Sequence, residues 1–165
     1  IKGIPSAADA LKAIAAAGAP FISRGDKSGT HTKELAIWKA AGLEPKGAWY
    51  QSAGQGMGAV LNMAQEQQAY TISDRATYLA QGDALGLVVV NEGDSAYFNI
   101  YHVITLNPAN GPNINSEGGE AFLTFLLDPE TQTFIGEFGI EEFGEPLFTP
   151  CADKACGVAA ATPAA

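Results

Sequence analysis

The nine residues "SRGDKSGTH" (23–31) combine one arginine, three hydroxyl side chains and two glycines directly after an apolar segment. Arg24 offers a planar cation with several N–H donors. Ser28 and Thr30 add hydroxyl donors, and Gly29 between them lets the backbone approach a ligand closely. Donors of these types suit an oxyanion that is held mainly by neutral groups, with one guanidinium supplying most of the charge compensation. The pattern predicts an anion-binding loop.

The same residues also fit a simple surface turn. In that interpretation Asp26 and Ser28 form the turn, Thr30 caps the following helix, and Arg24 pairs with Asp26. A nucleophilic pair of Ser28 and His31 is a third interpretation, but the sequence has no Gly-x-Ser-x-Gly motif and no obvious acid to orient the histidine. The glycine spacing matches neither a Walker loop nor the dinucleotide fingerprint. We therefore expect no enzyme activity and no nucleotide.

The elements around this loop would present it as a helix entry. Residues 19–23 ("APFIS") predict a short apolar strand, and residues 30–42 predict a helix, with Leu35, Trp38 and Ala41 at helical spacing. The N-terminus of a helix carries unpaired N–H groups and partial positive charge. A polar loop between a strand and such an end is a natural anion site.

A second glycine-rich turn repeats this arrangement. It is "GQGMG" (54–58), which follows a strand predicted around Trp49 and Tyr50 and opens a helix over 58–68. The turn is either a helix entry without a ligand or a source of further backbone donors.

A third loop enters a helix after a strand predicted over 69–73. We expect Ser73 to cap the helix, which covers 74–81 and places Arg75 in its first turn. Arg75 lies beside Asp74, so it either forms a structural ion pair or contacts a ligand. In α/β sheets ligands bind at the carboxyl ends of the strands, where the three loops would gather.

The remaining pattern predicts an α/β fold with helices on both faces of a sheet, because strands alternate with helices through residue 100. Ser6 and Gly18 bound a predicted helix. Further elements are expected as follows: β-rich runs over 84–91 and 96–108, two helices within 116–139 broken at Asp128-Pro129, and a tail after Thr149.

Composition limits the functional classes. The 165 residues suffice for one compact domain, or one domain and part of a second, and the net charge of -9 argues against nucleic acid and anionic membranes. No apolar run approaches the roughly 20 residues of a membrane helix. The first residues are not a signal peptide, so an exported protein would already have lost its leader.

The two cysteines, Cys151 and Cys156, are separated by four residues. They cannot complete a four-ligand zinc site by themselves, because no His or further Cys lies nearby. They form either a local disulfide in an oxidising compartment or a pair of free thiols. We expect neither a resident metal nor a cofactor.

Four segments in this order resemble the tungstate-binding proteins of bacterial ABC transporters, which are related to the extracytoplasmic carriers of molybdate and phosphate. They are "PFISRGDKSGTHTKELAIWKAAG", "WYQSAGQGMGAVLNMA", "AYTISDRATYLA" and "YHVITLNP". The resemblance covers residues 1 to about 150. It implies a type II periplasmic binding protein, in which two α/β lobes joined by crossing strands close on the ligand, with helices on both faces of a mixed sheet.

The resemblance also implies which residues bind. Phosphate carriers share an Arg-x3-Ser-Gly-Thr segment that holds the anion, and it matches Arg24, Ser28, Gly29 and Thr30. By the same resemblance, the helix entry at 56–58 would add amide donors. Its residues are Gly56, Met57 and Gly58.

The domain organisation implied by the family is incomplete in this sequence. Residues 1–100 would form the second lobe, residues 101–150 would return to a first lobe whose N-terminal half is absent, and residues 151–165 would be a tail. The implied protein is a non-catalytic periplasmic or extracytoplasmic carrier that passes tungstate, or secondly molybdate, to a membrane permease.

Two alternatives of the same fold remain. One is a phosphate carrier, which benefits from a carboxylate that accepts the proton of hydrogen phosphate. Asp26 could imitate that carboxylate, although we expect it to steady Arg24. The other is the oxyanion-sensing domain of a transcriptional regulator, although the sequence shows no basic helix-turn-helix.

Overall fold

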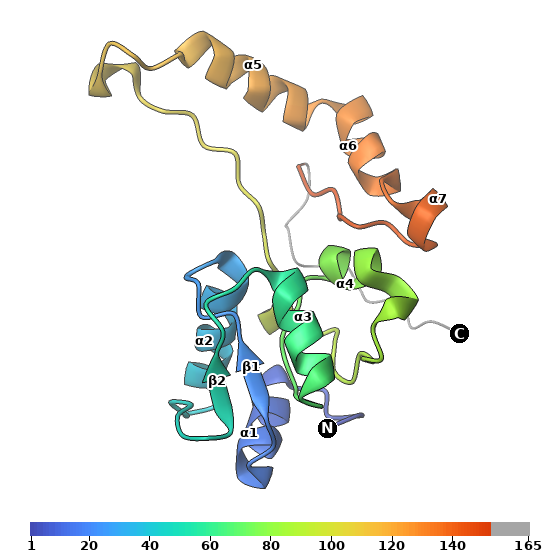
Figure 1. The fold of residues 1–165 in the computed structure, drawn as a ribbon. Coiled ribbons are helices and arrows are strands. Elements are labelled where there is room, and N and C mark those ends of the chain that lie inside the picture. Colours follow the sequence, from blue (N-terminus) through green and yellow to red (C-terminus); the bar gives the residue numbers. More distant parts are fainter. Residues whose placement is uncertain (153–165) are drawn as a thin grey trace. The chain divides into compact units, whose positions relative to one another are not determined.

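The computed structural model describes residues 1–152, apart from the side chain of Asp83, and divides them into two compact units (Figure 1). The first unit comprises residues 1–99, and the second begins at Ile100. Cys156 lies outside the described residues, so its disulfide with Cys151 stays a prediction. No helix in residues 1–152 is both long and apolar enough to cross a bilayer.

The first unit alternates strands and helices in the predicted order. Its four predicted helices are present with ends within two residues of the expected positions. The elements are α1 (Ala7–Ala17), β1 (Phe21–Ser23), α2 (Gly29–Ala40), β2 (Tyr50–Ser52), α3 (Met57–Glu66) and α4 (Arg75–Gln81), followed by the 3-10 turns η1 (Gly82–Ala84) and η2 (Ser95–Tyr97).

Local capping explains where these helices start and stop. Ser6 accepts a hydrogen bond at the start of α1, and Gly18 ends that helix with a left-handed φ of 59°, both as predicted. The predicted cap of α4 is wrong. Asp74, not Ser73, caps that helix, because its carboxylate accepts from the Thr77 N–H at 2.7 Å. The Ser73 hydroxyl instead donates to the Asp74 carbonyl.

The sheet is built around β1. β2 pairs with it in parallel, with Phe21 opposite Tyr50, and Tyr70 forms an isolated parallel bridge to Phe21 on the other side. The strand predicted over 69–73 is thus reduced to one bridge. In residues 1–152 the sheet is parallel throughout, whereas the family resemblance implies a mixed sheet.

Successive side chains of β1 point to opposite faces of the sheet, which gives the first unit two hydrophobic clusters. Phe21 packs against α1 and α2, and Ile22 packs against α3. The cluster around Phe21 contains Ala7, Leu11, Ile14, Ile37 and Trp38; the cluster around Ile22 contains Met57, Val60, Leu61, Ala64, Ala69 and Leu85. The predicted arrangement of helices on both faces is confirmed.

The second unit consists of helices and irregular chain. Its elements are η3 (Pro108–Asn110), α5 (Ser116–Leu127), α6 (Pro129–Glu137) and α7 (Ile140–Phe143). The predicted break at Asp128-Pro129 is present, because the Asp128 carboxylate caps α6 and Pro129 occupies its first turn.

The strands predicted over 84–91 and 96–108 are wrong. These segments have no strand partner, and several of their apolar side chains are exposed: Val88 is 74% exposed and Ile104 is 80% exposed, whereas Leu85 is buried in the cluster around Ile22. A run of branched and aromatic residues becomes a strand only when another strand completes its hydrogen bonds. Apolar side chains of α5 and α6 are exposed as well; they include Phe122, Phe125 and Phe134.

The burial of α3 predicts a large difference between two leucine substitutions. Leu61 is 2% exposed, whereas Leu35 on α2 is 44% exposed. We expect Leu61→Ala to lower the free energy of unfolding by about 2–5 kcal/mol. The matched variant Leu35→Ala should cost less than about 1 kcal/mol. Urea unfolding followed by circular dichroism would measure both, and equal losses would contradict this core.

A second matched pair tests the contact between the loop 24–28 and the end of β2. Gly25 and Gly18 both have left-handed φ angles, where alanine costs about 1–2 kcal/mol. A Cβ at Gly25 would also lie 1.9 Å from Ser52 Oγ, while nothing lies within 4 Å at Gly18. Gly25→Ala should therefore destabilise the protein more than Gly18→Ala in the same urea assay. Adding Ser52→Ala should recover part of the difference; no recovery would contradict the contact.

Candidate functional site

The parallel pairing places three loops at one edge of the sheet. Because β1, β2 and the Tyr70 bridge all run in the same direction, the loops 24–28, 53–56 and 71–74 follow the same ends of the strands (Figure 1). The first two loops are bonded to each other: the Gln55 N–H donates to the Arg24 carbonyl at 3.2 Å. The predicted gathering of the loops follows from this register.

The N-terminus of α2 leaves two of its backbone donors unused. Ser28, not Thr30, caps the helix by accepting from the His31 N–H at 3.2 Å. The N–H of Ser28 donates to Asp26 at 3.1 Å. The N–H groups of Gly29 and Thr30 make no hydrogen bond within residues 1–152. Two adjacent amides at a helix N-terminus therefore face outward beside the Ser28 hydroxyl.

Arg24 is held in place by Asp26. Its Nε and Nη2 atoms donate to Asp26 Oδ2 at 3.1 and 2.5 Å, which uses two of its five N–H donors. Hydrogen bonding by Ser28, and then the Arg24 guanidinium, hold the pKa of Asp26 well below its usual range. The ion pair was part of the surface-turn interpretation and of the anion-loop interpretation alike. Because Asp26 balances the charge of Arg24, neutral donors would have to make most of the hydrogen bonds to an anion.

The second helix entry has backbone donors but no cap. Gly56 precedes α3 without a side-chain hydrogen bond, and the N–H groups of Met57 and Gly58 have no acceptor within the described chain. The Met57 side chain is buried, so only its backbone is available. Gly58 also has a packing role, because a Cβ there would lie 2.8 Å from Gln81 Nε2.

Arg75 lies on the first turn of α4. It forms an ion pair with Glu92, and its side chain is 42% exposed. A contact between Arg75 and a ligand stays a prediction.

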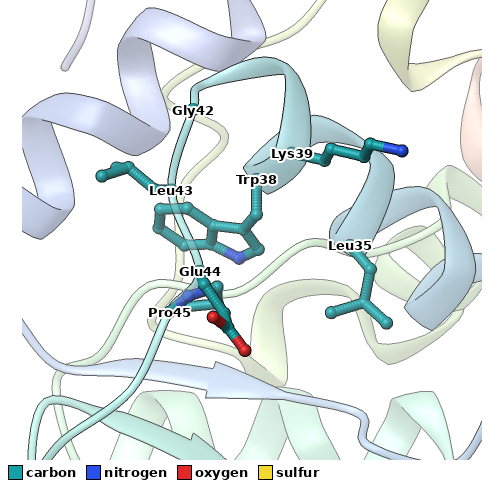
Figure 2. A pocket seen from close by; sticks show the side chains of 7 residues that line it. All are labelled: Leu35, Trp38, Lys39, Gly42, Leu43, Glu44 and Pro45. Carbon is teal, nitrogen blue, oxygen red and sulfur yellow. The ribbon is translucent and has the colours of Figure 1, made fainter.

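A hollow of about 370 Å³ lies near the other end of α2 (Figure 2). Figure 2 shows that the Trp38 side chain lies between the other labelled side chains of α2 and the segment that follows this helix. The lining residues are Leu35, Trp38, Lys39, Gly42, Leu43, Glu44 and Pro45. One lysine and one glutamate give this hollow no excess of positive charge, and none of the predicted anion ligands lines it.

A buried polar cluster around Glu34 was not predicted from the sequence. Glu34 is 2% exposed and accepts hydrogen bonds from Ser23, Trp38 and Tyr50. A signal was present: Glu34 shares the helix face of Ile37, Trp38 and Ala41, which marks it as an acid on a buried stripe.

The chain matches the model of a family described as the PBP superfamily domain over residues 2–130. Two curated relatives carry the name tungstate-binding protein TupA. The relative from Peptoclostridium acidaminophilum is 54% identical over 145 residues, covering 88% of this chain and 51% of its own. The relative from Campylobacter jejuni is 41% identical over 133 residues, covering 78% and 49%. This chain therefore spans about half the length of these relatives.

Two solved structures share both fold and sequence. One is described as the tungstate ABC transporter from Geobacter sulfurreducens, with a TM-score of 0.73, 46% identity, and coverage of 82% of this chain and 58% of the other. The tungstate-binding protein TupA from Desulfovibrio alaskensis has a TM-score of 0.75, 40% identity, and coverage of 91% and 61%. The predicted resemblance is confirmed: the chain belongs to the PBP superfamily, in which it is similar to tungstate-binding proteins.

Proposed function

We propose that this chain supplies one side of an extracytoplasmic, non-catalytic site for a tetrahedral oxyanion, tungstate first and molybdate second. The complete protein would deliver the anion to the permease of an ABC transporter. Relatives named as tungstate-binding proteins support this proposal. The observation that carries it is the pair of unused N–H groups at Gly29 and Thr30 beside the partly used guanidinium of Arg24.

The chemistry of this loop favours an anion without a proton. Tungstate and molybdate carry no proton at neutral pH, so their site needs donors only. A site for hydrogen phosphate also benefits from a carboxylate acceptor. The carboxylate in this loop, Asp26, is already bonded to Arg24 and to the Ser28 N–H. The proposed ligands are accordingly Arg24, Ser28, Gly29 and Thr30, with the amides of residues 56–58 and Arg75 as further donors.

The lobe assignment is also a proposal. Residues 1–100 would be the second lobe of the binding protein, residues 101–150 would return to the first lobe, and residues 151–165 would form a tail. The greater length of the curated relatives, of which this chain matches about half, supports it, as do the exposed apolar side chains of α5 and α6.

Isothermal titration calorimetry of the intact protein with tungstate tests the function directly. Arg24→Ala removes charge-assisted hydrogen bonds worth about 1.5–3 kcal/mol each, so we expect binding to weaken by about 10- to 100-fold. Lys12→Ala is the control, because it also removes one cation from an ion pair, with Asp9 on α1. It should leave the affinity within about twofold of wild type.

The same titration with molybdate and phosphate tests the choice of anion. We expect tungstate and molybdate to bind, and phosphate to bind with far lower affinity. Preference for phosphate, or equal heats from wild type and Arg24→Ala, would contradict the proposal.

A further inference from the structure

Glu34 is a buried carboxyl group surrounded by three donors. Ser23 Oγ donates to its Oε2 at 2.7 Å, while Tyr50 Oη and Trp38 Nε1 donate to its Oε1 at 2.7 and 3.1 Å. Glu34 is 2% exposed, and Ser23 is fully buried. A carboxyl group is costly to bury without partners, and here both oxygens are bonded.

The three donors come from the elements that form the candidate site. Ser23 is the last residue of β1 and directly precedes Arg24. Glu34 lies on α2, four residues after Thr30, and Tyr50 begins β2. Ser23 on β1 thus donates directly to Glu34 on α2. This bond joins the two elements that flank the loop 24–28.

The donors around Glu34 keep their protons over the physiological range. Burial raises the pKa of Glu34, against the opposing effect of its three hydrogen bonds. Burial also raises the pKa of Tyr50 to about 12, so this tyrosine stays a donor. His31, on the same helix, has a weaker electrostatic effect that favours the charged carboxylate. Without the carboxyl group, Ser23, Trp38 and Tyr50 would all lose an acceptor.

We propose that Glu34 is the positioning residue of the anion loop. By holding the end of β1 and the start of β2 against α2, it keeps Arg24 and the free N–H groups of Gly29 and Thr30 facing one anion. Glu34 itself does not touch the anion. This inference rests on the proposed oxyanion function and names the residue that fixes its geometry.

Two substitutions of Glu34 in the intact protein separate hydrogen bonding from charge. In Glu34→Gln the amide oxygen can accept from Trp38 and Tyr50, and the amide nitrogen can donate to Ser23, whose hydroxyl accepts as well as donates. Glu34→Ala leaves all three donors unpaired. Tungstate calorimetry would be done at a temperature where circular dichroism shows that every variant is folded. We expect the affinity of Glu34→Ala to fall by about tenfold or more, and that of Glu34→Gln to stay within about threefold of wild type.

A matched tyrosine pair provides a milder test. Tyr50→Phe removes a 2.7 Å bond to Glu34, and Tyr97→Phe removes a 2.7 Å bond to Asn91 that lies outside the β1–α2 junction. Both hydroxyls are half-buried donors to a side-chain oxygen. Tyr50→Phe should weaken tungstate binding about fivefold, whereas Tyr97→Phe should stay within about twofold.

The outcomes distinguish the two proposals. If wild type does not bind tungstate, the oxyanion function fails and the role of Glu34 fails with it. If wild type binds and Glu34→Ala binds equally well, only the role of Glu34 is overturned. Equal weakening by Gln and Ala would also overturn it, because charge would then matter and hydrogen bonding would not. If Glu34→Ala does not fold, the tyrosine pair decides, and equal affinities of those two variants overturn the role.

Discussion

β1 is three residues long and buried on both faces, and the first unit is arranged around it. Its backbone pairs with β2 on one side and with Tyr70 on the other. Its side chains alternate between two clusters, so Phe21 fixes α1 and α2 while Ile22 fixes α3. So short a strand is held by packing more than by its ladder, which has only three paired positions on the β2 side. The position of every loop at the strand ends depends on this packing.

The third residue of β1 connects this core to the candidate site. Ser23 is buried like its two neighbours, but its side chain is polar and requires a partner. Glu34 supplies that partner from α2, and Asp26 bonds both Arg24 and the start of the same helix. The carboxylates of Glu34 and Asp26 thus accept hydrogen bonds from the donors at each side of the loop. The amides of Gly29 and Thr30 remain unused between them, so the anion that we propose would bind without rearranging the hydrogen bonds of the loop.

Sequence patterns were informative wherever a residue acts locally. Ser6, Gly18 and the Asp128-Pro129 break all do in the structure what capping chemistry and proline geometry predict. The loop-to-helix entries were also predictable, because each combines a glycine or hydroxyl signal with a short apolar run. Choosing between Ser28 and Thr30, or between Ser73 and Asp74, was harder. Nearby residues of similar capping ability are distinguished only by backbone angles that the sequence does not reveal.

Non-local features escaped prediction for a physical reason. The segments 84–91 and 96–108 have strand-like composition, but a strand forms only if a second strand pairs with it. The sequence of the segment itself does not show whether such a partner is present. Glu34 was missed because its three donors come from residues 23, 38 and 50, which only the fold brings together. Its place on an apolar helix face was visible, but the identity of its partners was not.

The position of the free donors limits what the first unit can do alone. They all lie at one edge of one small sheet, so an anion held there would keep water on its opposite side. Water would weaken each hydrogen bond through its high dielectric constant. Strong and selective binding therefore requires a second surface that excludes water. Under the proposed function, the relatives contain further chain that could supply such a surface, because the matched part covers only about half of their length, and the geometry of the loop 24–28 would contribute to selectivity.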